Sequence, residues 1–209
     1  MSRPSGNTDL LLIEEARKLL PKTGCTGLNL REVASKAGVN LGMFHYHFKT
    51  KEEFTRRVLE TVYEEFFLDF SMEVSRDESS INNLRSALNS MGRFSRNNRA
   101  LILSLIRDAL NGDREVVRFV KKNFGRHFGV LVQIIRQCQK TGEIAKEPLP
   151  LIMAHLLGTV GVPHLIFELL ERSSTQRPFG LALSFMRKTV LSDAAIEKRV
   201  ERSLKGWRK

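Results

Sequence analysis

Apolar residues recur at helical spacing along almost the whole chain, and polar residues occupy the positions between them. Between Thr8 and Leu20, for example, Leu12, Ala16 and Leu19 fall on one helical face. No stretch shows the alternation and the Asn-Gly or Asp-Gly turns of a β-hairpin, and no repeat of about 20–50 residues occurs. The pattern predicts an all-α fold, with a three-helix head at the N-terminus and a larger C-terminal helical bundle.

Helix start and stop residues divide this pattern into segments. Ser, Thr, Asn or Asp before an apolar run, and Pro or Gly after it, are typical of helix boundaries. We expect Pro21 and Gly24 to end the first helix, and Asn29, Asn40 and Thr50 to open the next three. The predicted helices cover residues 8–20, 30–37, 41–48, 50–74, 81–95, 99–110, 115–140, 151–170, 177–191 and 193–205.

The predicted helices at 30–37 and 41–48 are short, and only Gly38-Val39-Asn40 separates them. Two short helices joined by a glycine-containing turn form either a helix-turn-helix unit or an ordinary helical hairpin. Small apolar residues such as Val33 and Ala37 permit close packing, and Gly38 permits a left-handed turn. In a helix-turn-helix unit the second helix enters the major groove of DNA while the first braces it.

Aromatic and polar side chains alternate on the second of these helices. Phe44 and Phe48 share one face, so we expect them to pack inside the head. The polar groups left facing outward are Tyr46, His47, Lys49, Thr50 and Lys51. Hydroxyl, imidazole and ammonium groups, together with the free N–H groups of a helix start, suit the phosphate oxygens of a nucleic acid.

The composition of the chain indicates the kind of partner that it binds and the compartment in which it resides. The chain has 34 Lys and Arg against 23 Asp and Glu, a net charge of +11 that favours DNA, RNA or an anionic membrane as partner. No apolar run approaches the roughly 18 residues that span a bilayer. Cys25 and Cys138 are too few for a disulfide framework, and Cys25 is either turn filler or a redox sensor. We therefore expect a cytoplasmic protein without membrane contact.

Residues 10–57 resemble the TetR (tetracycline-repressor) family of transcriptional regulators. The matching residues are Leu12, Ala16, Gly24, Leu30-Arg31-Glu32-Val33-Ala34, Ala37-Gly38-Val39, Gly42, Tyr46-His47-Phe48-Lys49, Lys51 and Glu52. The resemblance implies a helix-turn-helix DNA-binding domain at residues 1–57 and a ligand-binding and dimerisation domain at 58–209. Two positions depart from it, since the family usually has Tyr at His45 and commonly Thr at Met43. His45 either replaces the missing donor or is a partly buried structural residue.

Carried onto this sequence, the resemblance assigns DNA contacts to the head. Arg31 falls where the family's second helix reaches a base edge, and an Arg–guanine pair contributes about 1–3 kcal/mol of discrimination. The alternative for Arg31 is a surface charge or an ion pair at the helix start. Leu41, Gly42 and Met43 lead the recognition helix and favour thymine-methyl contact or shape readout. The predicted DNA-binding residues are Asn29, Arg31, Leu41, Gly42, Met43, Tyr46, His47, Lys49, Thr50 and Lys51.

The remaining chain predicts a sensing and dimerising body. The helices at 151–170 and 177–191 have broad apolar faces, which form either a four-helix bundle between two subunits or the core of one chain. A candidate small-ligand pocket comprises Phe94, Phe128, His155 and Thr159, which are otherwise ordinary core residues. The tail at 193–205 carries an apolar stripe that we expect to dock on the body.

Motifs for other chemistry are missing from the sequence. It has no Gly-rich phosphate loop, no G-x-S-x-G and no H-E-x-x-H, and His45 and His47 diverge on a helix, so we expect no enzyme, no cofactor and no metal site. The favoured function is a sequence-specific repressor released by a small ligand, with double-stranded DNA, a second copy and an unidentified small molecule as partners. The alternatives are a family-like DNA-binding protein that acts through protein partners, and a helical interaction module that has lost DNA binding.

Overall fold

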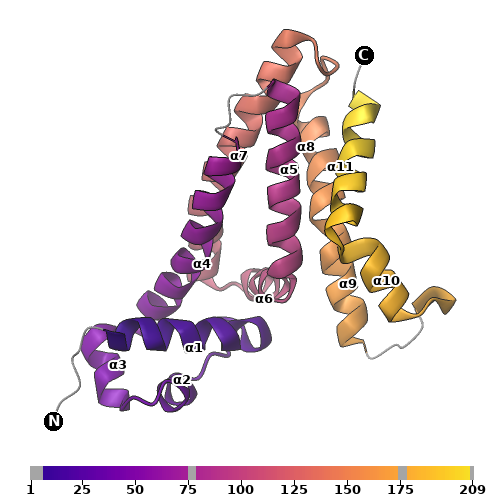
Figure 1. Cartoon of the computed structure of the whole chain (residues 1–209). Helices are drawn as coiled ribbons and strands as arrows, with labels where there is room; N and C mark the ends of the chain where they lie inside the picture. Colours follow the sequence, from indigo (N-terminus) through magenta and orange to yellow (C-terminus); the bar gives the residue numbers. More distant parts are fainter. Residues whose placement is uncertain (1–6, 75–78, 174–177, 208–209) are drawn as a thin grey trace. The chain divides into compact units, whose positions relative to one another are not determined.

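A computed structural model describes residues 7–74, 79–173 and 178–207 (Figure 1). Helices and no strand occur in this part of the chain, which confirms the predicted all-α class. The helices are α1 (Thr8–Thr23), α2 (Leu30–Lys36), α3 (Leu41–His47), α4 (Lys51–Val74), α5 (Ser80–Asn97), α6 (Arg99–Leu110), α7 (Arg114–Thr141), α8 (Leu149–Val160), α9 (Val162–Arg172), α10 (Leu183–Leu191) and α11 (Asp193–Trp207), with a 3-10 turn η2 (Pro178–Gly180).

The helices pack into two compact units. Unit 1 comprises Met1–Glu65 and Ala100–Asn123, and unit 2 comprises Phe66–Arg99 and Phe124–Lys209. Two long helices, α4 and α7, contribute to both units. The head helices α1 to α3 lie in unit 1 together with α6 and the first part of α7.

The core of the head forms where α1 lies across α2 and α3 (Figure 1). Leu12, Ala16 and Leu20 of α1 are completely buried; the helical spacing predicted this for Leu12 and Ala16, whereas Leu19, which it also placed on this face, is half-buried. They meet Val33 of α2 and Phe44 of α3, which are also completely buried. Burying a large apolar side chain contributes about 1.5–3 kcal/mol, so these few residues account for much of the stability of a small head.

In unit 2, α5, α8 and α11 lie side by side (Figure 1). The apolar stripe of the C-terminal tail packs into this group, because Ile196, Val200 and Leu204 are at most 1% exposed. Gly92 of α5 permits the close approach of α11, since a Cβ at this position would collide with the side chain of Ile196. The tail is therefore part of the body's own core, as expected from its stripe.

Three predicted helix boundaries are wrong. Helix α1 runs through Pro21 to Thr23 and ends at Gly24, the second of its two predicted stop residues. Pro21 removes only one N–H donor, and its carbonyl accepts a tertiary hydrogen bond from Ser104. The segment at 151–170 is two helices that meet at Gly161, not one. Helix α10 begins at Leu183 rather than 177, a residue outside the described part.

The expectation that no apolar stretch is long enough to span a bilayer is also wrong. Leu149–Arg172 is 24 residues long, has a mean hydropathy of 1.6 over its most apolar stretch, and meets the length and composition of a membrane span. Scattered polar residues such as His155 and His164 hide this in a search for an uninterrupted apolar run. Only 22% of that stretch is buried within one chain. The segment therefore offers an apolar surface for a further partner.

Candidate nucleic-acid interface

Side-chain caps hold the two short helices of the head. The Oδ1 atom of Asn29 accepts hydrogen bonds from the N–H groups of Arg31 (3.0 Å) and Glu32 (3.4 Å) at the start of α2. The Oδ1 atom of Asn40 accepts one from Gly42 (2.7 Å) at the start of α3. These contacts confirm both predicted caps. Helices of seven residues are unstable in isolation, so caps and packing decide whether they form.

The turn between α2 and α3 has the conformation that its glycine predicted. Gly38 has a φ of +67°, in the left-handed region that other residues rarely adopt. A Cβ atom added to Gly38 would meet no other atom of the described residues within 4 Å. Glycine is therefore needed here for its backbone conformation and not for lack of space. The N–H of Val39 donates to the carbonyl of Ala34 (3.0 Å) and closes the turn.

A cluster of three aromatic rings fixes α3 against α4. The rings of Phe44, Phe48 and Phe54 have centroid separations between 4.8 and 5.6 Å, and all three side chains are buried. Such packed aromatic pairs contribute about 0.5–1.5 kcal/mol beyond the area that they bury. The cluster holds one face of α3 inward and so determines which side chains of α3 face water.

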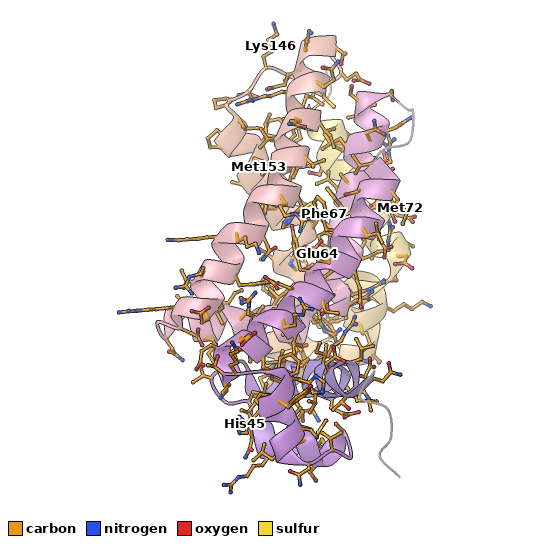
Figure 2. All side chains as sticks on the ribbon, turned by 90° about the vertical axis from the view of Figure 1, so that its left-hand side faces the viewer. His45, Glu64, Phe67, Met72, Lys146 and Met153 are labelled. Atoms are coloured by element: carbon orange, nitrogen blue, oxygen red, sulfur yellow. The ribbon has the colours of Figure 1, made fainter. Side chains whose placement is uncertain are left out.

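The outward face of α3 consists of His45 and Tyr46. Tyr46 is 78% exposed, and its ring contacts the ring of His47 edge to face. His45 is exposed at the outer edge of the head (Figure 2), which excludes the alternative of a buried structural histidine. The sequence alone did not decide between an exposed donor and a partly buried residue at His45, because the position lies between a core Phe and a surface Tyr. His47 is half-buried, and its Nε2 atom has no hydrogen-bond partner among the described residues.

The remaining predicted contacts of α3 and its flanks differ in exposure. Gly42 is exposed, whereas Leu41 and Met43 are half-buried. The side chains of Arg31 and Lys49 are exposed and have no hydrogen-bond or ion-pair partner among residues 7–74, 79–173 and 178–207. For Arg31, this disfavours an ion pair at the helix start. Both cations are therefore available to an external anion.

Thr50 caps the start of α4, as predicted, and the side chain of Glu53 reaches back to the residue before the cap. The N–H of Glu53 donates to the Oγ1 atom of Thr50 (3.1 Å), and the N–H of Lys49 donates to a carboxylate oxygen of Glu53 (3.3 Å). The ammonium of Lys51 donates to the carbonyl of Thr26 (2.7 Å) in the α1–α2 turn. Lys51 thus links the two segments of the head, and an external anion must compete with a neutral carbonyl for it.

A buried carboxylate of α6 holds the α1–α2 turn, which the sequence did not indicate. Asp108 is 2% exposed and accepts hydrogen bonds from the N–H groups of Cys25 (2.6 Å) and Thr26 (3.5 Å). Burial and the nearby charges of Asp108 and Asp113 raise the pKa of Cys25 to about 12. Because a thiolate is the reactive form, the neutral Cys25 thiol does not fit a redox sensor.

The four candidate ligand-pocket residues lie in two groups of unit 2. Phe94 of α5 stacks on Phe66 at 4.1 Å between ring centroids, and Phe128 of α7 lies 4.4 Å from the ring of His127. His127 in turn contacts Phe66, which joins these rings into one aromatic cluster. Phe66 and His127 were missed, although Phe66 repeats with Phe70 at the i, i+4 spacing that predicts a shared helical face.

The other two candidates lie on α8. His155 is exposed and has its ring 5.5 Å from that of Trp207 in α11. The hydroxyl of Thr159 donates to the carbonyl of His155 (2.9 Å), so it is satisfied within its own helix. The assignment of these four residues to one pocket stays a prediction.

These features define an all-α protein with a helix-turn-helix head of the DNA-binding type. Residues 12–58 match the family described as bacterial regulatory proteins, tetR family, and cover the same head. No curated protein matches the chain in sequence. The match confirms the resemblance found in the sequence, for residues 12–58.

Similarity to solved structures extends the likeness of the fold to the body. The transcriptional regulator FadR of Bacillus subtilis, in complex with stearoyl-CoA, gives a TM-score of 0.71 at 14% identity, over 94% of this chain and 98% of that one. The ketosteroid transcriptional regulator KstR2 of Mycobacterium tuberculosis gives 0.69 at 16% identity, over 98% of this chain and 96% of that one. The whole chain therefore has the fold of these transcriptional regulators.

Proposed function

We propose that the chain is a homodimeric transcriptional repressor whose head binds DNA and whose body releases the DNA on binding a small ligand. The observation that carries DNA binding is the outer surface of the head. There Arg31, Tyr46 and Lys49 are exposed, and the two cations lack partners in the described segments. Unpaired donors beside a recognition helix suit phosphates and base edges.

The proposal keeps the predicted division of labour. Residues 1–57 are the DNA-binding domain, and residues 58–209 bind the ligand and dimerise. Arg31 reads a base edge, Lys51 binds phosphate, and exposed His45 joins the ten predicted DNA-binding residues. The repressor is cytoplasmic and performs no catalytic reaction, and it needs no cofactor or metal ion.

Dimerisation is supported by the apolar surface of the last helices. The residues of α8, α9 and the region of α10 that are large, apolar and more than 40% exposed are Leu151, Val162, Ile166, Leu169, Leu181 and Phe185. Pairing these helices with those of a second copy forms a four-helix bundle and removes the apolar area from water, at about 25 cal/mol per Å². Two joined heads then read two half-sites about one DNA turn apart.

Substitution in this surface tests the dimer. Ile166→Glu places a charge at a half-exposed position of α9, and we expect it to shift the protein from dimer to monomer in sedimentation-velocity measurements. Leu68→Glu is the matched control, because Leu68 is 62% exposed on α4, outside the proposed interface. A dimer that tolerates Ile166→Glu would place the interface elsewhere.

Release by a ligand requires that the ligand binds the released conformation better than the DNA-bound one. A coupling of about 1–3 kcal/mol changes DNA affinity about 5–150-fold. The stearoyl-CoA bound to FadR and the aromatic cluster around Phe66 make an acyl-CoA the first ligand to test. If no small molecule releases the DNA, the alternative of control through a protein partner replaces this part of the proposal.

Selection of bound sequences from a random duplex pool tests DNA binding directly. We expect a repeated half-site, because two heads of one dimer bind together. Arg31→Ala should relax preference at one base, and Lys51→Ala should weaken binding to all sequences and reduce its salt dependence. Lys140→Ala, at an exposed lysine of α7 outside the proposed interface, is the control and should leave base preference and salt dependence unchanged. Recovery of no preferred sequence would contradict the proposal.

A further inference from the structure

A hollow of about 200 Å³ lies in unit 1, and not in unit 2, which contains the aromatic cluster around Phe66. It is lined by the α1–α2 turn, the first turns of α4 and the start of α7, and one side of it is open to water. Its floor is apolar, because Leu59 and Val116 are at most 3% exposed and Cys25 beside them is a buried thiol. An apolar cavity of about 150 Å³ holds a benzene molecule, so this hollow is large enough for an aromatic ring system.

Most charged groups on the wall of the hollow already have partners. Arg56 pairs with Glu60 (3.2 Å), and Glu115 pairs with Arg118. Asp113 caps α7, since its Oδ1 atom accepts hydrogen bonds from the first N–H groups of that helix. Arg56 and Glu115 are thus paired within the protein, whereas Asp113 keeps its charge and is held by the N–H groups that it caps.

Lys51 differs from these groups. Its ammonium donates to the carbonyl of Thr26 (2.7 Å), and no carboxylate lies within 4.0 Å of it in the described parts of the chain. A carbonyl satisfies one N–H but leaves the positive charge uncompensated, and an ammonium has two further donors. The neighbouring Glu52 is exposed, so water screens its charge. The hollow therefore combines an apolar floor with one uncompensated cation at its rim.

We propose that this hollow binds a small aromatic carboxylate, with the ring on the floor formed by Leu59 and Val116 and the carboxylate on Lys51. The carboxylate forms a charge-assisted hydrogen bond, which is stronger than the bond to the neutral carbonyl. The ligand bridges the α1–α2 turn, α4 and α7. A consequence, which rests on the proposed function, is that the ligand competes with DNA phosphate for the ammonium of Lys51.

Titration calorimetry of the full chain with 2-naphthoate tests the site. We expect one site per chain with a Kd of about 1 mM or tighter, and binding of the neutral isostere 2-naphthamide weaker by about tenfold or more. Lys51→Met keeps the aliphatic stem and removes the charge. It should weaken the binding of 2-naphthoate by the same factor of about ten or more. Lys49→Met is the matched control, because Lys49 is an exposed lysine outside the hollow and should leave Kd unchanged.

Val116→Phe provides an independent test, since it fills the floor and should abolish binding while Lys51 is intact. If this variant does not fold, Lys51→Met alone decides. Absence of saturable binding, or wild-type affinity in both variants, overturns the proposal, and the latter result would place the ligand in another site such as the body. If calorimetry shows the predicted binding but 2-naphthoate leaves DNA affinity unchanged, the site stands and the competition with phosphate is wrong.

Discussion

Unit 1 and unit 2 are both helical, but they differ in how they carry charge. The residues of unit 1 include 15 Lys and Arg against 12 Asp and Glu, whereas those of unit 2 include 19 against 11. Most of the net charge of +11 therefore lies outside the unit that contains the predicted DNA-binding residues. We therefore expect the proposed DNA binding to depend on a few well-placed donors such as Arg31 and Lys49, not on a general excess of positive charge.

The two units also differ in the polar contacts that stabilise them. Unit 1 uses bonds from side chains to backbone, as at Asn40 and Asp108, to hold short helices and turns. Unit 2 contains a network of ion pairs. The Nε atom of Arg99 lies 3.0 Å from a carboxylate oxygen of Glu168, and the Nη2 atom of Arg99 lies 2.9 Å from a carboxylate oxygen of Glu171. We therefore expect unit 1 to be sensitive to the loss of single caps and core rings, and unit 2 to be sensitive to pH.

The largest effect is expected in the aromatic core of the head. Phe44→Ala removes a completely buried ring that contacts Phe48 and Phe54, and should lower the free energy of unfolding by about 3–5 kcal/mol in urea denaturation. DNA binding should be lost with it. Tyr46→Ala is the control on the same helix, since Tyr46 is 78% exposed and should leave stability unchanged. Equal midpoints for both variants would show that the rings do not hold α3.

A pH-dependent effect of about 3 kcal/mol is expected from a buried histidine of unit 2. His164 is completely buried, and its Nε2 atom lies 3.0 Å from a guanidinium nitrogen of Arg199. Because arginine only donates, Nε2 must accept, and the ring is neutral. Burial, and then the charges of Arg199 and two further arginines, lower the pKa of His164 from 6.5 to about 4.

The sign of the effect follows from this lowered pKa. The unfolded chain protonates His164 near pH 6.5 and the folded chain only near pH 4, so the free energy of unfolding falls as the pH drops between these values, by ~3 kcal/mol in total. Denaturation at several pH values measures it. His164→Gln keeps an acceptor and should flatten this part of the pH dependence, whereas His155→Gln, at an exposed site, should not. If the free energy of unfolding of His164→Gln still falls between pH 6.5 and pH 4, the pH dependence arises from other groups.

A smaller loss is expected where α6 holds the α1–α2 turn. Asp108→Asn removes the charge that accepts hydrogen bonds from Cys25 and Thr26, and should lower the free energy of unfolding by about 1.5–3 kcal/mol. Hydrogen exchange at the amide of Cys25 should accelerate. Asp69→Asn, at an exposed position of α4, is the control. Unchanged exchange in Asp108→Asn would mean that the turn is held by its other contacts.

The smallest effect is expected at the cap of the recognition helix. Asn40→Ala removes the acceptor of the Gly42 N–H and should lower stability by about 1 kcal/mol, with weaker DNA binding because α3 frays. Asn40→Ser retains a capping oxygen and should behave like the wild type. Urea denaturation and DNA titration compare the two, and a loss as large for Ser as for Ala would point to another role for Asn40.

Sequence reasoning succeeded where local chemistry decides the structure. The caps at Asn29, Asn40 and Thr50 and the left-handed Gly38 act within a few residues of chain, so their roles could be predicted from spacing. The inward face of α3 was predictable for the same reason, because Phe44 and Phe48 lie four residues apart. Helix ends supported by distant residues were not predictable, and the extension of α1 through Pro21 is the clearest case.

By itself, the sequence determined the helical class, the head with its capped helices, and the family that residues 12–58 resemble. Only the tertiary structure decided that His45 is exposed, that Asp108 holds the α1–α2 turn, and that Lys51 stands beside a hollow without a carboxylate partner. The physical reason is range. Helix spacing and caps act between near neighbours in the chain, whereas burial, cavities and ion pairing depend on residues that only folding brings together.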